Sequence, residues 1–180
     1  MTNAPSTPDL PGPVRQVGFV VDDLDSTLKS LVALGIGPFY VVRGQKLQAN
    51  YRGEPSEVTL TIALANSGDM QIEVIVQEAG DPSIYTEFLA EGHGGFNQFA
   101  YWADDFDGAV KSAIDAGWPV VWSGGETEGV RFAYFEPPDG PVPIIEITEL
   151  NEATAGLGEW LRSEADGWDG TNPIRSITGQ

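Results

Sequence analysis

VRQVGFVVDDLDSTLKSLVALG, residues 14–35, returns later in the chain as FNQFAYWADDFDGAVKSAIDAG, residues 96–117. Gln98 follows Gln16 by 82 positions, and the same interval separates the other matching residues of the two copies. A constant interval without gaps indicates an internal duplication. In each copy an apolar run leads to Asp-Asp and then to apolar residues at helical spacing, ending at a glycine. This pattern predicts a strand followed by a helix with a glycine just beyond its end.

Further strand-like runs follow each predicted helix. They cover 38–43, 56–65 and 70–77 in the first half, and 119–123, 129–136 and 142–149 in the second. Alternation is clearest in EVTLTIAL, where every second residue is a large apolar one. Both halves therefore read βαβββ. The aspartate pairs at 22–23 and 104–105 stand just before the helices, where a carboxylate caps free NH groups.

The duplication also divides the chain. We expect a flexible N-terminal arm over 1–13, a first module over 14–77, a connection over 78–95 with a short helix near Ile84–Ala90, a second module over 96–150 and a C-terminal extension over 151–180. The extension begins with weak helical character. Its last residues are polar and rich in turn formers, so no structure is predicted for them.

Composition limits the classes of partner. The chain has 41% hydrophobic residues, 27 acidic and nine basic residues, and no cysteine. A net charge of −18 repels nucleic acid and anionic bilayers. The apolar runs are too short to span a membrane, and the first residues lack the features of a secretory signal. We expect a cytoplasmic monomer or homodimer that acts on a small molecule, with no nucleic acid and no membrane as partner.

The tandem βαβββ pattern resembles the vicinal oxygen chelate superfamily, which includes glyoxalase I, methylmalonyl-CoA epimerase, extradiol dioxygenases and bleomycin and fosfomycin resistance proteins. The DDLD and DDFD helix starts and the MQIEVIVQ and VPIIEITEL strands carry the resemblance over about residues 14–150. It implies an α+β fold in which two tandem βαβββ modules form a cupped mixed sheet around one central cavity. Because this scaffold hosts several chemistries and metal-free binders, it indicates fold more strongly than function.

In metal-using members of that superfamily, four residues from the first and last strands of the modules hold one divalent ion. The matching positions are Gln16, Glu73, Gln98 and Glu146, where the usual set is His, Glu, His, Glu. Two carboxylates and two amide oxygens suit Mg²⁺, Mn²⁺ or Ca²⁺, and suit Zn²⁺ or Ni²⁺ only weakly. Without a metal, each glutamine could donate its amide NH₂ to a neighbouring carboxylate. Both interpretations, a metal centre and a metal-free cavity, remain open.

Strand alternation predicts which side chains share the face of these four residues. Gly18 and Ala100, two positions beyond the glutamines, would leave space for a ligand. Gln71 and Thr148 fall on the same faces of their strands as Glu73 and Glu146. The predicted substrate contacts are the aromatic residues Tyr51, Trp102, Trp122 and Phe132, which would serve equally well as core, together with Arg43 and His93.

Two of those contacts lie in predicted loops. Arg43, Lys46 and Arg52 fall together in one loop, where they could attract an anionic substrate or be solvated. His93, the only histidine, stands in the glycine-rich segment before Gln98. It is either a substrate contact or an exposed loop residue.

The resemblance leads to a hypothesis about chemistry. We expect a glyoxalase-like lyase or isomerase that abstracts a proton next to a carbonyl, with Glu146 as base or metal ligand and Glu73 as its partner. Gln16 and Gln98 would bind the metal or polarise a substrate oxygen. The alternative is a metal-free small-molecule binding protein that resembles bleomycin resistance proteins.

Overall fold

The computed structural model describes residues 7–92, 94–125 and 129–177. Its elements in chain order are β1 (Gln16–Val20), α1 (Leu24–Ala33), β2 (Phe39–Tyr51), β3 (Glu54–Ser67), β4 (Met70–Gly80), α2 (Ile84–Ala90), β5 (Gly95–Ala103), α3 (Phe106–Asp115), β6 (Val120–Gly124), β7 (Phe132–Phe135), β8 (Ile144–Glu149), α4 (Glu152–Asp166) and β9 (Ile174–Ile177). The expected βαβββ order is present in both halves.

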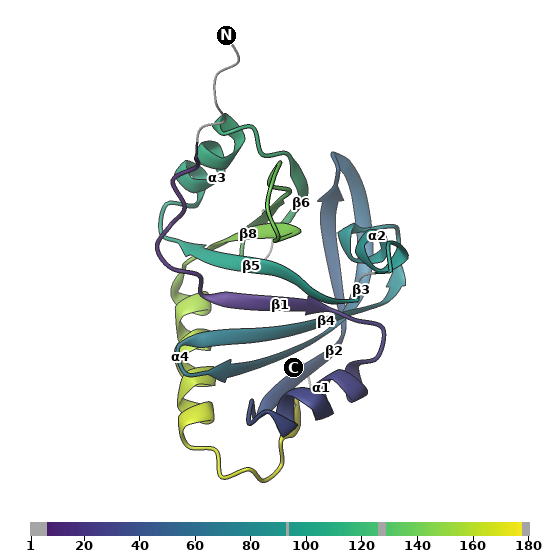
Figure 1. Ribbon diagram of the computed structural model, residues 1–180, viewed down its shortest axis with the longest axis vertical. Helices are drawn as coiled ribbons and strands as arrows, with labels where there is room; N and C mark the ends of the chain where they lie inside the picture. The colour runs from purple at the N-terminus through teal and green to yellow at the C-terminus, as the bar shows by residue number, and fades with distance from the viewer. Residues whose placement is uncertain (1–6, 93, 126–128, 178–180) are drawn as a thin grey trace.

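The strands form one sheet in the order β3-β4-β1-β5-β8-β7-β6-β2-β9. Because β2 also pairs with β3, the sheet closes on itself as a barrel-like cup (Figure 1). The pairs β1–β4, β5–β8 and β2–β9 are parallel, and the other pairs are antiparallel. The structure confirms the predicted α+β fold with a cupped, mixed sheet.

The two modules meet where β1 pairs antiparallel with β5. Gln16 lies opposite Ala100 and Gly18 lies opposite Gln98, so the repeated glutamines are diagonal neighbours. Antiparallel pairing of two copies of one motif relates the modules by an approximate two-fold axis through this pair of strands. The last strands, β4 and β8, flank β1 and β5 and bring their residues toward the same axis.

The helices begin and end as the repeat predicts. Asp23 and Asp105 are the N-cap residues of α1 and α3, and each accepts a backbone NH three residues later at 2.9 Å. Gly35 and Gly117 follow the helices with φ of 82° and 86°, a conformation that glycine adopts without steric cost. These capping contacts explain why the Asp-Asp pairs recur.

Three apolar clusters hold the elements together. One packs α1 against the first module, and one packs α3 against the second. The third joins the inside of the cup to α2 and is centred on the fully buried Trp122. In Figure 1, α2 and α4 lie at opposite ends of the central strands. Packing from α2 therefore fills one end of the cup.

Strand β2 is much longer than the predicted run 38–43. Arg43 and Lys46 lie on this strand and not in a loop, which corrects the expected basic loop. A register shift occurs at Arg43–Gly44, where Gly44 has φ of 66°, and pairing with β3 then resumes. The hairpin turns at Arg52–Gly53, both with positive φ, as a two-residue hairpin requires. The exposed residues 43–46 and the register shift interrupt the apolar alternation, which resumes at Leu47, Ala49 and Tyr51.

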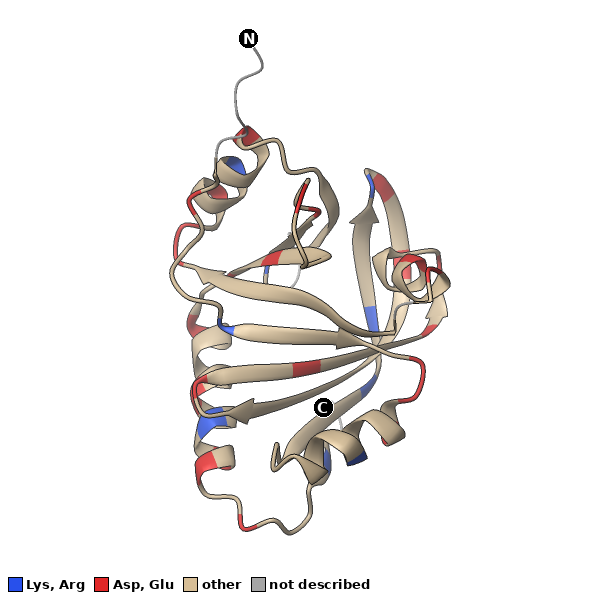
Figure 2. Cartoon of the chain, viewed as in Figure 1, with Lys and Arg blue, Asp and Glu red and all other residues tan. Residues whose placement is uncertain are grey.

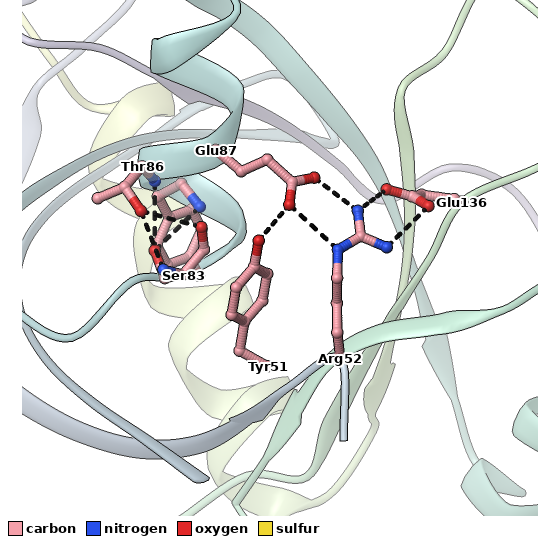
Figure 3. A network of polar contacts seen from close by, with 7 residues as sticks. Tyr51, Arg52, Ser83, Thr86, Glu87 and Glu136 are labelled. Carbon is pink, nitrogen blue, oxygen red and sulfur yellow. Dashed lines mark hydrogen bonds and ion pairs between the residues drawn. The ribbon is translucent and has the colours of Figure 1, made fainter. Parts of the chain in front are cut away.

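Arg52, at that turn, joins three segments of the chain (Figure 3). Its guanidinium group binds Glu87 of α2 and Glu136, the residue after β7. The Tyr51 hydroxyl donates to the same Glu87 carboxylate. Hydrogen bonds from Arg52 lower the pKa of Glu87. This network connects the tip of the β2–β3 hairpin to both halves of the protein.

Residues 151–177 of the C-terminal extension contain a helix and a strand, whereas the sequence allowed no structure to be predicted for its last residues. Strand β9 pairs in parallel with the start of β2, from Phe39↔Ile174 to Val42↔Ile177. The Arg175 guanidinium group binds Glu164 of α4 at 2.8 Å and the Tyr40 hydroxyl at 2.6 Å. Four half-exposed residues without alternation carry no strand signal of their own. The pairing with β2 creates this strand.

Acidic residues are spread over helices and strand ends on the view in Figure 2, with few basic residues among them. The described part of the chain contains no helix that is long and apolar enough to cross a membrane.

Candidate active site

The amide group of Gln98 lies between the carboxyl groups of Glu73 and Glu146. Its Nε2 donates to Glu146 Oε2 at 2.9 Å and lies 3.4 Å from Glu73 Oε2. The same nitrogen is 3.0 Å from the Tyr134 hydroxyl. Gln98 has no exposed surface, and Glu146 is 7% exposed. Glutamates from the two modules therefore meet around one buried amide.

Strand register and one glycine produce this arrangement. Gly18 pairs with Gln98 on one side and with Glu73 on the other. A Cβ atom at Gly18 would lie 2.5 Å from Gln98 Cδ, so the Gln98 side chain passes directly over the glycine. The expectation that Gly18 leaves space for a ligand is therefore wrong, because a side chain of the protein fills that space.

Gln16, the counterpart of Gln98, makes a different contact. Its Nε2 donates to Gln71 Oε1 at 2.6 Å, along the parallel pair β1–β4. Ala100 stands beside Gln16 where Gly18 stands beside Gln98, so a methyl group takes the corresponding space. The duplicated glutamines thus have unequal roles in the geometry. Gln98 bridges the acids, and Gln16 lies with Gln71 on the adjoining wall.

Burial changes the protonation of both acids. It raises the pKa of Glu73 to about 8, and the nearby charge of Glu146 adds to this shift. Burial also raises the pKa of Glu146, while hydrogen bonds from the Thr148 hydroxyl, at 2.7 Å, and from Gln98 oppose the rise. Two interacting carboxyl groups titrate as a pair. The pair therefore retains a proton near neutral pH.

Two tyrosines lie behind the acids. The hydroxyl groups of Tyr85 and Tyr134 are 3.2 Å apart, and burial raises the pKa of both well above the usual value. Both hydroxyls therefore stay neutral. Gln98 Oε1 is buried without a hydrogen-bond partner among the described residues. An unpartnered buried oxygen is costly, so this atom can accept a hydrogen bond or bind a cation.

The acids open into a cavity of about 380 Å³. Polar groups line the part near Glu73 and Glu146, and apolar side chains line most of the rest. Its walls are Gln16, Val42, Gln45, Ile62, Leu64, Gln71, Glu73, Trp102, Val130, Glu146, Thr148, Ala153, Thr154 and Leu157. Three of the four positions of the expected metal set line the cavity, and Gln98 lies beneath them.

The predicted substrate contacts have separate locations. Trp102 lines the cavity. Trp122 is fully buried in the core, and Phe132 packs against that cluster. The Tyr51 hydroxyl is bound to Glu87. None of these last three is among the residues that line the cavity.

The two basic candidates also lie apart from the acids. Arg43 is exposed, 3.9 Å from the Asp25 carboxylate, and is not among the cavity-lining residues. His93 lies outside the described residues.

Sequence reasoning missed the contribution of α4. Ala153, Thr154 and Leu157 line the cavity from a helix that lies beyond the second module. Leu157 and the buried Leu161 are four residues apart and mark one apolar face of this helix. The four-residue spacing of these leucines indicates an apolar helix face in the sequence, but it does not show which part of the protein that face covers.

The residues around the acids can be compared with the needs of a metal ion. Among residues 7–92, 94–125 and 129–177, no three His, Cys, Asp or Glu side chains gather closely enough to hold one. The carboxylates of Glu73 and Glu146 remain as ligands. If the Gln98 amide is turned over, its Oε1, which has no hydrogen-bond partner among the described residues, lies beside them. This all-oxygen set fits a hard cation such as Mg²⁺, Mn²⁺ or Ca²⁺ and lacks the nitrogen or sulfur that Zn²⁺ or Ni²⁺ prefers.

Comparisons with known proteins agree with the fold. A family model described as the glyoxalase/bleomycin resistance protein/dioxygenase superfamily matches residues 15–134. No curated protein matches the sequence.

Several solved structures share the fold. A methylmalonyl-CoA epimerase from Mycobacterium tuberculosis has 20% identity and a TM-score of 0.55, over 82% of this chain and 93% of that one. A Streptomyces coelicolor methylmalonyl-CoA epimerase has 17% identity and a TM-score of 0.52, over 80% and 97%. A hypothetical protein from Bacillus halodurans C-125 has 14% identity and a TM-score of 0.52, over 78% and 95%.

Proposed function

The chain belongs to the glyoxalase/bleomycin resistance protein/dioxygenase superfamily, and we propose that it is a small-molecule isomerase or lyase that moves a proton next to a carbonyl group. One observation carries the proposal: Glu73 and Glu146 meet at one cavity, joined by the Gln98 amide, with their pKa values raised. Two carboxyl groups that hold one proton supply a base and an acid at the same pH.

Glu146 is the base in this proposal. Its carboxylate is fixed by the Thr148 hydroxyl on one oxygen and by the Gln98 amide on the other. These two donors favour the ionised form of Glu146, whereas burial and the charge of Glu146 both favour the protonated form of Glu73. Glu146 would take the proton from the carbon beside the carbonyl, and Glu73 would supply one. In an isomerase Glu73 returns the proton to that carbon, and in a lyase it protonates the leaving group.

A developing enolate needs hydrogen-bond donors. Gln16 presents one amide hydrogen to Gln71 and has a second hydrogen available for a substrate oxygen at the cavity wall. The apolar walls limit water around the reacting carbon, which strengthens such hydrogen bonds. We therefore assign Gln16 to the substrate oxygen and Gln98 to the placement of the two acids.

A hard divalent cation is compatible with this site. Glu73, Glu146, Gln98 and Gln16 would hold it, with the Gln98 amide turned to present its oxygen. Such an ion would polarise the substrate oxygen as a Lewis acid. Two of the structural neighbours are methylmalonyl-CoA epimerases, which favours isomerisation over elimination as the proposed reaction. This support rests on the shared fold alone.

Solvent exchange tests the proposed function. The protein is incubated in D₂O with a panel of neutral ketones, hydroxyketones and dicarbonyl compounds, and deuterium beside the carbonyl is followed by NMR. The Glu146→Gln variant should lose about 100-fold or more of any exchange that the wild type catalyses. The matched control is Glu54→Gln, the same change at an exposed residue, which should keep the wild-type rate. Equal exchange by wild type and Glu146→Gln would reject Glu146 as the base.

A metal-free binding protein is the second candidate. It is favoured by the Gln98 NH₂ group, which satisfies Glu146 and approaches Glu73 without any ion. A binder would hold a compound from the panel tightly while its deuterium content stayed unchanged. The exchange experiment therefore separates the two candidates on one set of samples.

A further inference from the structure

No lysine or arginine is among the described residues that line the cavity. All nine Lys and Arg residues of the chain lie within the described ranges. Six of the nine form ion pairs with carboxylates elsewhere, namely Arg43, Arg52, Lys111, Arg131, Arg162 and Arg175. Lys29 and Lys46 are exposed on α1 and β2.

Arg15 is the remaining cation. Its guanidinium carbon lies 4.9 Å from the centre of the Trp102 ring, and it lines a separate hollow beside α3. Trp102 lines both spaces, whereas Arg15 lines only the hollow beside α3. An anion in the cavity would face Glu73 and Glu146 with no ion-pairing partner among these nine residues. Burying an unpaired charge is costly, and like charges nearby increase the cost.

Helix α4 supplies the outer wall of the same cavity. Thr154 and Leu157 line it, and Leu157 is 41% exposed, which places it at the opening. A Cβ atom at Gly158 would lie 2.8 Å from the Trp102 ring, so the helix backbone rests on that ring.

Several contacts hold α4 in place. The Thr154 hydroxyl donates to the Glu149 carbonyl oxygen at 2.9 Å, and the Arg175–Glu164 ion pair fastens the other end of the helix. The helix lies wholly outside the residues that match the family model. The α4 wall of the cavity is therefore built on a fixed element.

We propose that the cavity takes a small, uncharged, largely apolar molecule, and that Leu157 of α4 is a specificity-determining contact with it. The proposal rests on the proposed function in taking the cavity over Glu73 and Glu146 as the substrate site. In the metal-free cavity it excludes phosphorylated and carboxylated compounds as substrates. The amides of Gln16, Gln45 and Gln71 provide hydrogen bonds for carbonyl or hydroxyl groups, and Leu157 with Trp102 contacts the apolar part.

Two fluorescent probes that share one skeleton test the charge preference. N-phenyl-1-naphthylamine is neutral, and 8-anilino-1-naphthalenesulfonate adds one sulfonate to the same rings. Titration into the purified protein should give saturable binding of the neutral probe, at least about tenfold tighter than binding of the sulfonate. Equal affinities, or no binding of the neutral probe, would overturn the proposal.

Substitutions at the opening test the role of Leu157. Leu157→Trp should weaken binding of the neutral probe about fivefold or more, because the larger side chain fills the opening. Leu157→Arg should tighten binding of the sulfonate relative to the neutral probe, because it introduces the missing cation. Leu34→Arg, at an exposed leucine after α1, is the matched control and should change neither affinity. Circular dichroism checks that each variant is folded. Unchanged binding in both Leu157 variants would reject Leu157 as a contact.

Neither probe measurement depends on turnover. If the protein catalyses solvent exchange but does not prefer the neutral probe, the proposed class of substrate is rejected and the proposed enzymatic function stands. If the protein prefers the neutral probe but catalyses no solvent exchange, the proposed class of ligand stands and the proposed enzymatic function is rejected.

Discussion

Replacement of Gly18 by alanine tests the contact on which the acid pair depends. In a strand, this change is ordinarily stabilising by about 0.5 to 1 kcal/mol, because alanine loses less backbone freedom on folding. Here the new Cβ would lie 2.5, 2.6 and 2.8 Å from Cδ, Cγ and Nε2 of Gln98. These distances are far below van der Waals contact, and Gln98 has no exposed surface. The Gln98 side chain must therefore leave its place between the acids.

The cost has two parts. Extra atoms in a packed interior cost about 1 to 3 kcal/mol, and a lost hydrogen bond to a charged group costs about 1.5 to 3 kcal/mol. Relaxation of the side chain lowers the sum, so we expect Gly18→Ala to reduce the free energy of unfolding by about 2 kcal/mol or more. Proton exchange activity should fall together with stability because the carboxylates lose their common donor.

Urea denaturation of matched variants measures this effect. Gly156→Ala, inside α4 with open space around the new methyl group, should stabilise the protein by about 0.5 to 1 kcal/mol. In a Gln98→Ala background the clash is gone, and Gly18→Ala should then cost nothing. A Gly18→Ala protein that is as stable as wild type, or a cost that persists without the Gln98 side chain, would refute the reasoning.

Three further predictions concern stability. The pKa of Glu73 is raised in the folded state, so its contribution to stability is complete below its ordinary pKa of 4.5. That contribution is lost as pH rises toward about 8. With a chelator present, the urea midpoint of Glu73→Gln should therefore vary less over this pH range than the midpoint of wild type. Arg52→Ala should lower the unfolding free energy by about 1 kcal/mol at low salt and by less at high salt, since its pairs with Glu87 and Glu136 are partly exposed; an equal loss at both salt concentrations would point to packing instead. Arg175→Ala should speed hydrogen exchange of the β9 amides and leave β1 and β5 protected, whereas uniform acceleration would show that β9 is not a separate unit.

The duplicated segments allowed most of the fold to be predicted from the sequence. Their constant interval placed β1 with α1 and β5 with α3, and the resemblance to the vicinal oxygen chelate superfamily implied that Glu73 and Glu146 converge. These elements have strong local signals, because caps, glycines and apolar periodicity all agree. The full length of β2 was missed because the exposed residues 43–46 interrupt its apolar alternation before it resumes at Leu47, Ala49 and Tyr51.

The parts that depend on tertiary contact could not be predicted. Strand β9 exists because it pairs with β2, and its own four residues show no alternation. Gln98 and Gln16 look equivalent in the sequence, but Gly18 beside one and Ala100 beside the other give them different partners. Leu157 showed an apolar helix face but not the cavity that this face covers.

Carboxyl titration is the most direct test of the central claim that Glu73 and Glu146 form an acid–base pair in the cavity. Protein labelled with ¹³C at the glutamate side-chain carboxyl group is titrated by NMR, with Glu73→Gln and Glu146→Gln used to assign the two signals. The account predicts a pKa of about 8 for Glu73 and a raised pKa for Glu146, with the pKa of Glu73 falling once Glu146 is replaced, because the charge of Glu146 contributes to the rise. Titration of both signals near 4.5, each unaffected by replacement of the other residue, would contradict it.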